Sequence, residues 1–490
     1  MAMISERLRE SYDALPYTSR PVPQSHPDRL HVMAHLHGLD AAPVTGCRVL
    51  ELGCAAGGNL LPMAAQLPDS EFVGVDLSER QCASASADAS ALGLSNVSIL
   101  NGDIVDPDLA GRIGRFDYVI AHGLYSWVPQ AVQQALPATI ARLMADDGVA
   151  YVSYNTYPGW RQRGLVRRFL LDAVAELDDP VERAAQARSA LDLWAETEQA
   201  GGAYAAILRE ERERVAMLDD SFLLHDLLEA ENHPVWFEDF NASIEAAGLL
   251  WMSESNLSVS RLENFPQQLR LILAQSVEPT AREQRIDFWL NRSLRESLLC
   301  RAGRAPQRNL MPTRLAGLWA TTALRPDGPG DPQEGAEAFY TGPGGLRIGL
   351  RAAAAKRALD ALAADAPLFV RLADLNARTR QPDVVTALMI DLFYRNLVEL
   401  SPRQPDYVIR SGSRPRAAAV ARRQAREGAV VTNQRHQSVT LDDEDAARLL
   451  PLLDGRQDRA GLRTQFAAAG GTADLDVVLD ALARQALLVG

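Results

Sequence analysis

A chain of 490 residues is longer than one hydrophobic core usually organises, so we expect roughly two to four domains. Its 47% hydrophobic and 23% charged residues are typical of a globular protein. The formal net charge of −13 argues against a protein that binds nucleic acid through its overall field. Five arginines between Arg414 and Arg426 leave room for a local basic patch, although a solvated helix or linker face is the simpler interpretation.

The four cysteines, Cys47, Cys54, Cys82 and Cys300, show no paired spacing. A disulfide framework or a zinc site is therefore not expected, and the composition fits a reducing compartment. The first residues contain no apolar run typical of a signal peptide, and no stretch of about eighteen apolar residues predicts a transmembrane helix. We therefore expect a cytoplasmic protein without membrane insertion and without a bound metal.

Short apolar runs alternate with helical patterns between residues 48 and 155. Continuous apolar runs indicate strands buried on both faces, and apolar residues spaced by three and four indicate helices. Their alternation predicts right-handed βαβ units and a parallel sheet covered on both faces, which is a doubly wound α/β fold. The expected strands are Arg48–Leu52, Glu71–Asp76, Val97–Asn101, Phe116–Ala121 and Gly148–Asn155, and the expected helices are Gly57–Gln66, Glu79–Leu92, Asp106–Arg112 and Pro129–Met144.

The pattern changes after residue 155. Residues 160–231 are helical, charged and rich in alanine, which predicts a helical insertion. A helix over Val235–Ala247 ends at Gly248, and the apolar runs Leu249–Glu254 and Ser297–Cys300 predict two late strands that complete the sheet. Many glycines and prolines lie between residues 322 and 349, which favours a linker. The expected division is 1–175 for an N-terminal arm and the first part of the core, 176–234 for the helical insertion, 235–305 for the late strands, 306–350 for the linker and 351–490 for a small C-terminal domain.

The segment Glu51–Asn59 reads Glu-Leu-Gly-Cys-Ala-Ala-Gly-Gly-Asn and joins the first strand to a helix through a tight turn. Glycines suit this turn because the backbone bends sharply and a ligand can lie against it. The pattern E-x-G-x-A-x-G departs from the G-x-G-x-x-G of dinucleotide sites and resembles motif I of class I methyltransferases. Glu51 is placed to orient the turn and, through intervening groups, a cofactor ammonium. Ala55 replaces a common glycine, which we expect to be tolerated because alanine can stand where φ is negative.

Two further acidic residues follow the next strands of the predicted sheet. Asp76, followed by Leu77, ends the second strand and can accept hydrogen bonds from both hydroxyls of a ribose. Asp103, followed by Ile104, ends the third strand and can accept from an adenine amino group. Together with the glycine turn they lie on the edge where such sheets bind ligands, and they predict an adenosine-bearing ligand. The alternative is that unrelated acids cap these strands, and the altered glycine pattern disfavours NAD.

Aromatic and amide side chains follow the fourth and fifth strands. Methyl transfer is an in-line displacement at a sulfonium carbon, which requires proximity, alignment and exclusion of water. His122, Tyr125 and Trp127 follow the fourth strand, where aromatic rings suit contact with a sulfonium or a methylated ammonium. We interpret His122 as a contact to the cofactor edge rather than a general base, and packing beneath the next loop is the alternative for both aromatic residues. Asn155 and Tyr157 follow the fifth strand, where the Asn155 carbonyl can accept from an incoming amine.

The segment before the first strand is unusual for a terminal tail. Tyr12–Pro21 and Ser25–Pro27 combine aromatic residues with prolines. This composition predicts an arm that folds over the cofactor and that includes Tyr17, whereas a mobile surface arm is the alternative.

Five segments resemble the bacterial methyltransferases that carry a methyltransferase regulatory domain: YDALPYTSRPVPQSHP, ELGCAAGGNLLPMA, GVDLS, FDYVIAHGLYSWVP and YVSYNTYPGW. HDLLEAENHPVWFEDF is similar to the regulatory region, and VTNQRHQS with LLDG is similar to the C-terminal winged-helix-like domain of the family. The resemblance implies a seven-stranded, Rossmann-like class I methyltransferase core with a helical insertion, an α+β winged-helix-like domain and S-adenosylmethionine as cofactor. The residues then expected at the cofactor are Tyr17, Glu51, Gly53, Cys54, Ala55, Gly57, Asn59, Asp76, Leu77, Asp103, Ile104 and His122, and those expected at the acceptor are His122, Tyr125, Trp127, Asn155 and Tyr157.

Characterised relatives in this family include protein lysine methyltransferases that modify outer-membrane proteins, so the resemblance implies an enzyme that methylates lysine side chains of a protein. A small-molecule N- or O-methyltransferase of natural-product tailoring is the second hypothesis. A non-catalytic cofactor-binding module is the third, and intact residues at three cofactor positions weigh against it. The negative charge suits a basic, lysine-bearing partner. We expect the winged-helix-like domain to contact protein rather than nucleic acid.

Overall fold

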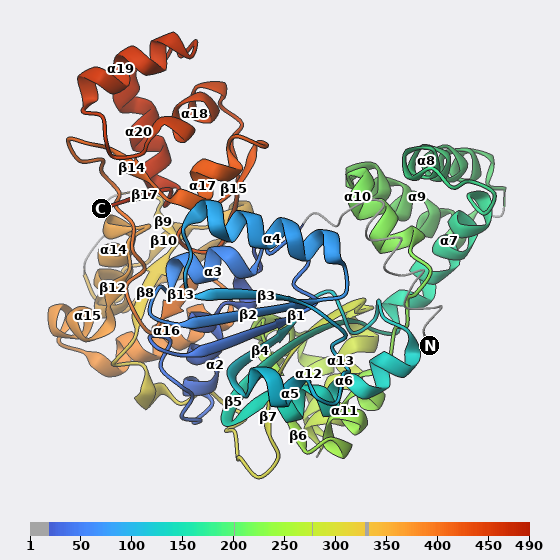
Figure 1. Cartoon of the computed structure of the whole chain (residues 1–490). Helices are drawn as coiled ribbons and strands as arrows, with labels where there is room; N and C mark the ends of the chain where they lie inside the picture. The colour runs from blue at the N-terminus through green and yellow to red at the C-terminus, as the bar shows by residue number, and fades with distance from the viewer. Residues whose placement is uncertain (1–18, 200, 277, 329–332) are drawn as a thin grey trace.

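The computed structural model describes residues 19–199, 201–276, 278–328 and 333–490. Its centre is a seven-stranded sheet in the order β3-β2-β1-β4-β5-β7-β6 (Figure 1). The first five strands are parallel, and β7 runs antiparallel between β5 and β6. The strands are β1 (Arg48–Leu52), β2 (Glu71–Asp76), β3 (Val97–Asn101), β4 (Phe116–Ala121), β5 (Met144–Asn155), β6 (Leu249–Glu254) and β7 (Leu294–Arg301). This sheet confirms the expected fold class, including the two late strands.

Helices cover both faces of the sheet because neighbouring strand residues point to opposite sides. In β1, Val49 packs into one hydrophobic cluster with helix α2, and Leu50 packs into another with helices α6 and α11. The helices of this core are α2 (Pro27–Leu36), α3 (Leu60–Gln66), α4 (Glu79–Leu92), α5 (Leu109–Ile113), α6 (Gln130–Leu143), α11 (Phe237–Ala246), α12 (Gln267–Ala274) and α13 (Pro279–Leu290). Gly248 follows α11 with a φ of 78°, as its predicted role at the end of this helix requires.

The helical insertion stands away from the sheet, on the other side of the molecule from the C-terminal domain (Figure 1). It consists of α7 (Gly159–Ala173), α8 (Pro180–Thr197), α9 (Gly202–Met217) and α10 (Asp220–Leu223), which share their own hydrophobic core. A π-helical turn over Leu224–Leu228 leads the chain back toward the sheet. Such turns are rare and often lie at functional sites.

A buried ion network joins the two late strands to α13. The guanidinium of Arg295 in β7 is fully buried and pairs with Glu254 of β6 at 2.7 Å and with Asp287 of α13 at 2.8 Å. The charges satisfy each other, so the network stabilises this corner only while all partners are present.

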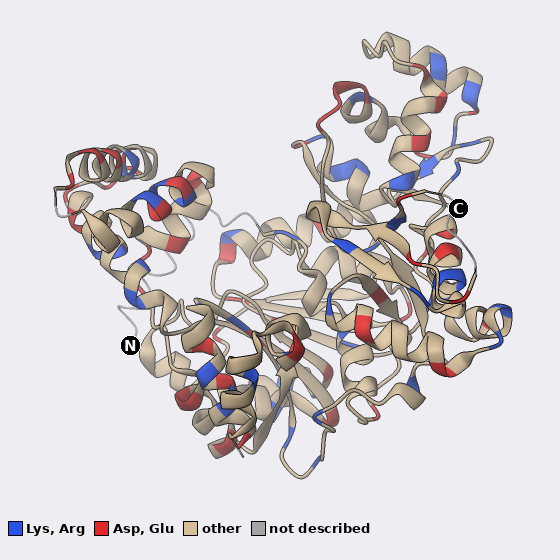
Figure 2. Ribbon diagram, turned by 180° about the vertical axis from the view of Figure 1, so that it is seen from behind, with Lys and Arg blue, Asp and Glu red and all other residues tan. Residues whose placement is uncertain are grey.

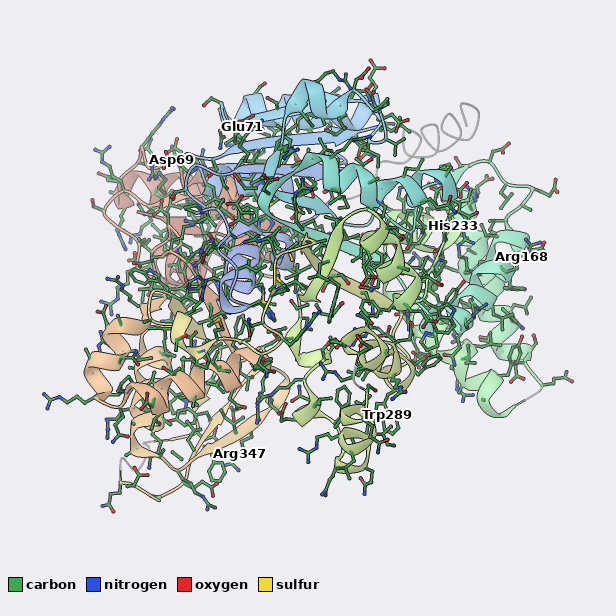
Figure 3. All side chains as sticks on the ribbon, turned by 90° about the horizontal axis from the view of Figure 1, so that it is seen from below. Asp69, Glu71, Arg168, His233, Trp289 and Arg347 are labelled. Carbon is green, nitrogen blue, oxygen red and sulfur yellow. The ribbon has the colours of Figure 1, made fainter. Side chains whose placement is uncertain are left out.

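Trp289 at the end of α13 lies on the outer surface (Figure 3), where 57% of it is exposed.

Residues 310–401 form a folded layer against the core. Two three-stranded antiparallel sheets, β11-β10-β9 and β12-β8-β13, are covered by helices and share a hydrophobic cluster with α2. The structure therefore differs from the expected linker over 306–350 and from the expected boundary at 351, because the glycines and prolines lie in tight turns such as Pro343–Gly345. The elements are β8 (Trp319–Thr322), β9 (Arg325–Pro326), β10 (Ala338–Thr341), β11 (Arg347–Leu350), α14 (Ala353–Asp365), β12 (Val370–Arg371), α15 (Leu372–Thr379), α16 (Pro382–Tyr394) and β13 (Val398–Ser401).

The C-terminal domain has a separate hydrophobic core that spans residues 417–488. It contacts the domain of the central sheet through a hydrogen bond from the Gln66 side chain to the Asn433 carbonyl at 3.0 Å and through an ion pair between Arg423 and Asp88. Acidic and basic residues are interspersed along its chain (Figure 2). The elements are β14 (Arg416–Ala417), α17 (Ala419–Gln424), β15 (Val430–Thr432), β16 (Ser438–Thr440), α18 (Glu444–Leu449), α19 (Arg459–Ala468), α20 (Leu475–Arg484) and β17 (Leu488–Val489).

Within the described ranges, none of the helices combines the length and apolarity needed to cross a membrane.

Candidate functional site

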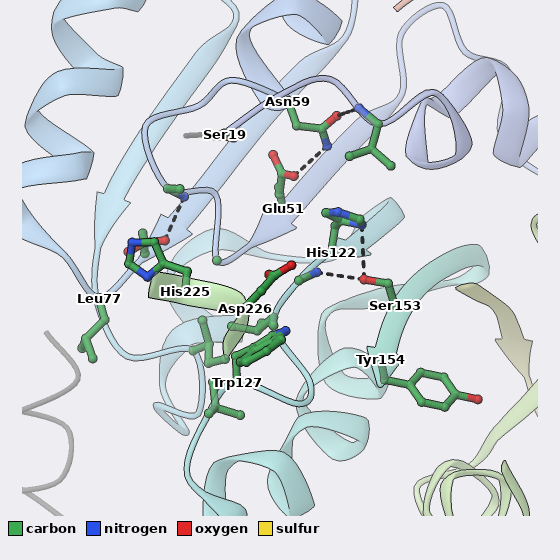
Figure 4. Close-up of a pocket in the computed structure, with 18 of the residues that line it drawn as sticks. Ser19, Glu51, Asn59, Leu77, His122, Trp127, Ser153, Tyr154, His225 and Asp226 are labelled. Carbon is green, nitrogen blue, oxygen red and sulfur yellow. Dashed lines mark hydrogen bonds between the residues drawn. The ribbon is translucent and has the colours of Figure 1, made fainter. Parts of the chain in front are cut away.

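A cavity of about 440 Å³ lies at the carboxyl ends of strands β1 to β5 (Figure 4). This is the edge where open α/β sheets bind ligands. Eleven of the predicted site residues line it: Glu51, Gly53, Ala55, Asn59, Asp76, Leu77, Asp103, Ile104, His122, Trp127 and Asn155. The strand ends have thus brought together most of the residues that the sequence singled out.

The turn after β1 is held open by left-handed backbone conformations. Gly53 and Gly57 have φ values of 73° and 77°, and Ala55 has a φ of 47°. The prediction of a negative φ at Ala55 is therefore wrong, and the alanine costs about 1 kcal/mol of strain there. In return, its backbone N–H donates to Asp76 Oδ2 at 2.8 Å. A Cβ on Gly58 would lie 2.0 Å from the Ser19 carbonyl oxygen, so this glycine lets the N-terminal segment cross the turn.

Glu51 lines the cavity, and its carboxyl group is only partly hydrogen-bonded. Its Oε1 accepts a hydrogen bond from Asn59 Nδ2 at 2.7 Å, whereas its buried Oε2 has no hydrogen-bond partner among the described residues. Burial raises the pKa of Glu51 to about 8. A positively charged donor would relieve both the orphaned oxygen and the cost of ionisation. The site therefore fits the ammonium group of S-adenosylmethionine.

The acidic residues after β2 and β3 face the same cavity. Asp76 accepts backbone hydrogen bonds from Ala55 at 2.8 Å and from Ser78 at 2.9 Å, which orients its carboxylate. The exposed Asp103 accepts from the Val105 N–H at 3.0 Å, and Ile104 beside it is buried. Oriented acceptors beside an apolar side chain suit a ribose and an adenine ring, so these residues also fit the expected cofactor.

His122 sits in a polar chain at the end of β4. Its Nδ1 lies 3.2 Å from both the Tyr151 hydroxyl and Ser153 Oγ, and Tyr151 donates to Glu296 at 2.7 Å. Desolvation lowers the pKa of His122 to about 4. The imidazole is therefore neutral near pH 7 and suits a contact better than the work of a general base, which needs a pKa near the operating pH.

Four predicted residues lie outside the cavity lining, and a fifth is not described. Cys54 is buried beneath the turn, and Gly57 lies within the turn, before α3 begins at Leu60. Tyr125 packs in the core, with its ring 5.2 Å from that of Phe240. Tyr157 packs against Trp236 with 5.2 Å between ring centroids. Tyr17 falls outside the described residues. The expected roles of these five residues stay predictions.

The helical insertion supplies residues that sequence reasoning missed. Arg163 of α7, Phe222 of α10, and His225 and Asp226 of the π-helical turn all line the cavity. The Trp160 ring lies 6.0 Å from that of Trp127 in an edge-to-face arrangement, and the Arg163 guanidinium lies 4.6 Å from the Trp160 centroid. His225 and Asp226 begin the segment HDLLEAENHPVWFEDF, but its sequence does not place it at the cavity, because these residues reach the sheet only through the packing of the insertion. Residues 19–22 also line the cavity, so the described part of the N-terminal arm lies over it.

Three family models match the chain. They are a methyltransferase domain over residues 49–148, a predicted methyltransferase regulatory domain over 219–301 and the C-terminal winged helix domain of PKMT over 413–486. Uncharacterized protein RP028 of Rickettsia prowazekii is 31% identical over 239 residues, which are 49% of this chain and 95% of that protein. This chain belongs to the class I methyltransferases that carry a methyltransferase regulatory domain. The family expected from the sequence motifs is thus confirmed.

Other relatives of this methyltransferase extend over different parts of the chain. Uncharacterized protein RP789 of Rickettsia prowazekii is 36% identical over 300 residues, and the alignment covers 61% of this chain and 54% of that protein. This chain thus spans about half the length of RP789. The structure of PKMT2 from Rickettsia typhi in complex with AdoHcy is 24% identical, with a TM-score of 0.86 over 97% of this chain and 100% of that one. That likeness establishes a shared fold, including the winged helix.

The regulatory domain match changes how the middle of this methyltransferase is understood. Residues 219–301 include the cavity residues Phe222, His225 and Asp226, and they also include strands β6 and β7 of the central sheet. The matched region is therefore part of both the sheet and the site, and it does not coincide with the insertion expected over 176–234.

Proposed function

We propose that this protein transfers a methyl group from S-adenosylmethionine to the ε-amino group of a lysine on a protein substrate. When bound, the cofactor supplies an electrophilic methyl group on a sulfonium sulfur. Glu51 would hold its ammonium group, Asp76 its ribose and Asp103 its adenine, each from the end of a different strand. The structural likeness to PKMT2, solved with AdoHcy, supports this assignment.

The main observation in favour of a lysine acceptor concerns the carboxylate of Asp226. It lines the cavity, and within the described part of the chain it makes no hydrogen bond or ion pair of its own. Burial raises the pKa of Asp226, and the charge of Arg163 partly opposes that shift. Asp226, Trp127 and His122 line the same cavity (Figure 4). A cavity lined by a carboxylate and by indole rings suits a cation with an apolar stem, which describes lysine.

The polar groups around this carboxylate can prepare the amine for attack. Asp226 would hold the lysine ammonium and bring its nitrogen into the cavity. The carboxylate itself favours the charged amine, whereas desolvation in the cavity opposes this by lowering the pKa of the amine and favouring the neutral nucleophile. Asn155 donates from Nδ2 to Asn232 Oδ1 at 3.2 Å, which turns its own Oδ1 into the acceptor available to the amine. The nitrogen forms the N–C bond as the C–S bond breaks, the electron pair stays on sulfur, and the surplus proton leaves to solvent.

The test is methylation of a bacterial lysate by the purified full chain with methyl-labelled S-adenosylmethionine, followed by mass spectrometry of labelled proteins. We expect label on lysine side chains, and Asp226→Asn should raise the KM for the acceptor at least tenfold because one charge-assisted hydrogen bond is lost. Affinity for S-adenosylhomocysteine should change less than twofold. Glu196→Gln, an exposed carboxylate of α8, is the matched control. Label confined to small molecules, or an unchanged KM in Asp226→Asn, would overturn the proposal.

A further inference from the structure

Asn59 is the point where three distant parts of the chain meet. It is buried at the start of α3, and its Nδ2 donates to Glu51 Oε1 at 2.7 Å and to Ser25 Oγ at 3.1 Å. Its Oδ1 accepts from the Val22 N–H at 2.8 Å and lies 2.8 Å from Nε2 of His436. Both amide hydrogens and both oxygen lone pairs are therefore used. The last of these partners comes from the C-terminal winged-helix domain, 377 positions further along the chain.

The tautomer of His436 follows from these contacts. A backbone N–H can only donate, so the Val22 contact identifies the Asn59 atom as the oxygen, and His436 must donate to it from Nε2. Burial lowers the pKa of His436 well below its usual value, so the ring stays neutral. Its Nδ1 then carries a lone pair, which is buried without a hydrogen-bond partner in the described structure. The imidazole thus acts here as a single, well-defined donor.

The backbone conformation that directs His436 toward Asn59 is strained. The residue lies between β15 and β16 with a φ of 55°, in the left-handed region where a glycine would be unstrained. Strain of this kind persists where surrounding contacts impose it. Those contacts are present on both sides: Asn433 accepts from Gln66 of α3 at 3.0 Å, and Arg435 pairs with Glu399 of β13. The hairpin is therefore held against the sheet domain with its imidazole directed at Asn59.

We propose that His436 is a positioning residue for the cofactor, so that the winged-helix domain completes the cofactor site from behind. By holding Asn59, His436 fixes two groups of the site. One is Oε1 of Glu51, which accepts from Asn59, and the other is the backbone of Val22 in the segment that crosses the glycine turn. His436 itself touches no reacting atom. This inference rests on the proposed cofactor site and does not depend on which acceptor is methylated.

The test compares His436→Leu with His436→Gln in the full chain. Leucine removes the donor, whereas the glutamine amide can place a donor near the original Nε2. Isothermal titration with S-adenosylhomocysteine measures binding without any acceptor, so failure of the lysine proposal would leave this result untouched. We expect His436→Leu to weaken binding about tenfold, as loss of one buried hydrogen bond implies, and His436→Gln to recover most of that loss.

A structural control separates the hydrogen bond from the stability of the domain. Leu462→Ala leaves a cavity in the winged-helix core, at a residue that is 1% exposed, without touching Asn59. It should lower the thermal unfolding midpoint at least as much as His436→Leu does and leave affinity for S-adenosylhomocysteine within twofold of wild type. Wild-type affinity in His436→Leu, or equal weakening by Leu462→Ala, would overturn the inference.

Discussion

The binding of cofactor to this protein should depend on pH through Glu51. Burial raises the pKa of this carboxyl to about 8, so the empty protein keeps it protonated near neutral pH. A bound ammonium favours the ionised carboxylate, and binding below pH 8 therefore releases a proton. The ionised fraction falls from one half at pH 8 to about 1% at pH 6, which corresponds to a loss of affinity of about fiftyfold, or roughly 2 kcal/mol. Above pH 8 the cofactor amine itself loses its proton, so affinity is greatest near pH 8.

Isothermal titration of S-adenosylhomocysteine in buffers with different heats of ionisation measures both the affinity and the number of protons released. We expect close to one proton released at pH 6. Glu51→Gln cannot ionise, so it should bind more weakly than wild type at pH 8 and show a flat affinity between pH 6 and pH 8. An equally steep pH dependence in Glu51→Gln, or no proton release by wild type, would refute the assignment of this carboxyl to the ammonium group.

The raised pKa of Glu51 also makes the stability of the cofactor-free protein depend on pH. A carboxyl whose pKa is raised by folding stabilises the folded state fully below its unfolded value of 4.5, and that contribution is lost as the pH rises through about 8. The free energy of unfolding of wild type should therefore fall relative to that of Glu51→Gln as the pH rises from 5 to 9.

Two further predictions concern the framework of the site. Arg295→Met leaves the buried carboxylates of Glu254 and Asp287 with Arg292 as their remaining cationic partner among the described residues. The free energy of unfolding, measured by urea denaturation, should therefore fall by about 3–5 kcal/mol, and an unchanged midpoint would show that the ion network does not hold the late strands. Gly58→Ala places a methyl group 2.0 Å from the Ser19 oxygen, so the N-terminal segment must move away from the turn. If that movement costs about 1.4 kcal/mol of binding free energy, binding of S-adenosylhomocysteine weakens tenfold, and we expect at least this loss. Gly111→Ala, which adds a methyl group to open space, should bind normally, and equal affinities in the two variants would contradict the crossing segment.

The first four strands could be predicted to the residue because each is a short, mainly apolar run that alternates with a helical pattern. The predicted boundaries were displaced where strand pairing or backbone conformation, rather than the local apolar pattern, determines where an element begins. Strand β5 begins at Met144 rather than Gly148, because an irregular pairing with Phe116 extends it. Helix α3 begins at Leu60 rather than Gly57, whose φ of 77° excludes it from a helix. Register shifts and left-handed turns are properties of the assembled sheet, which a local apolar pattern does not encode.

The residues of the site also fall into those that the sequence could predict and those that it could not. Asp76 is the last residue of β2 and His122 directly follows β4, and the topology of a parallel sheet brings these positions to one edge. Tyr125, which is also near a strand end, packs instead against Phe240. The direction of a side chain after the strand depends on the helix that covers that face. Asp226 could not be found by this reasoning, because it approaches the sheet through a turn that only the packing of the insertion positions.

The regulatory region cannot be a detachable module of this fold. Strand β7 lies between β5 and β6, and it pairs with β5 over the length of Ala150–Asn155. That stretch ends at Asn155, which lines the cavity, and the turn that carries Asp226 belongs to the same region. Removing the region would expose the edge of β5 and leave the cavity without one of its walls. Any influence that the region has on activity must therefore act by moving residues that already belong to the site.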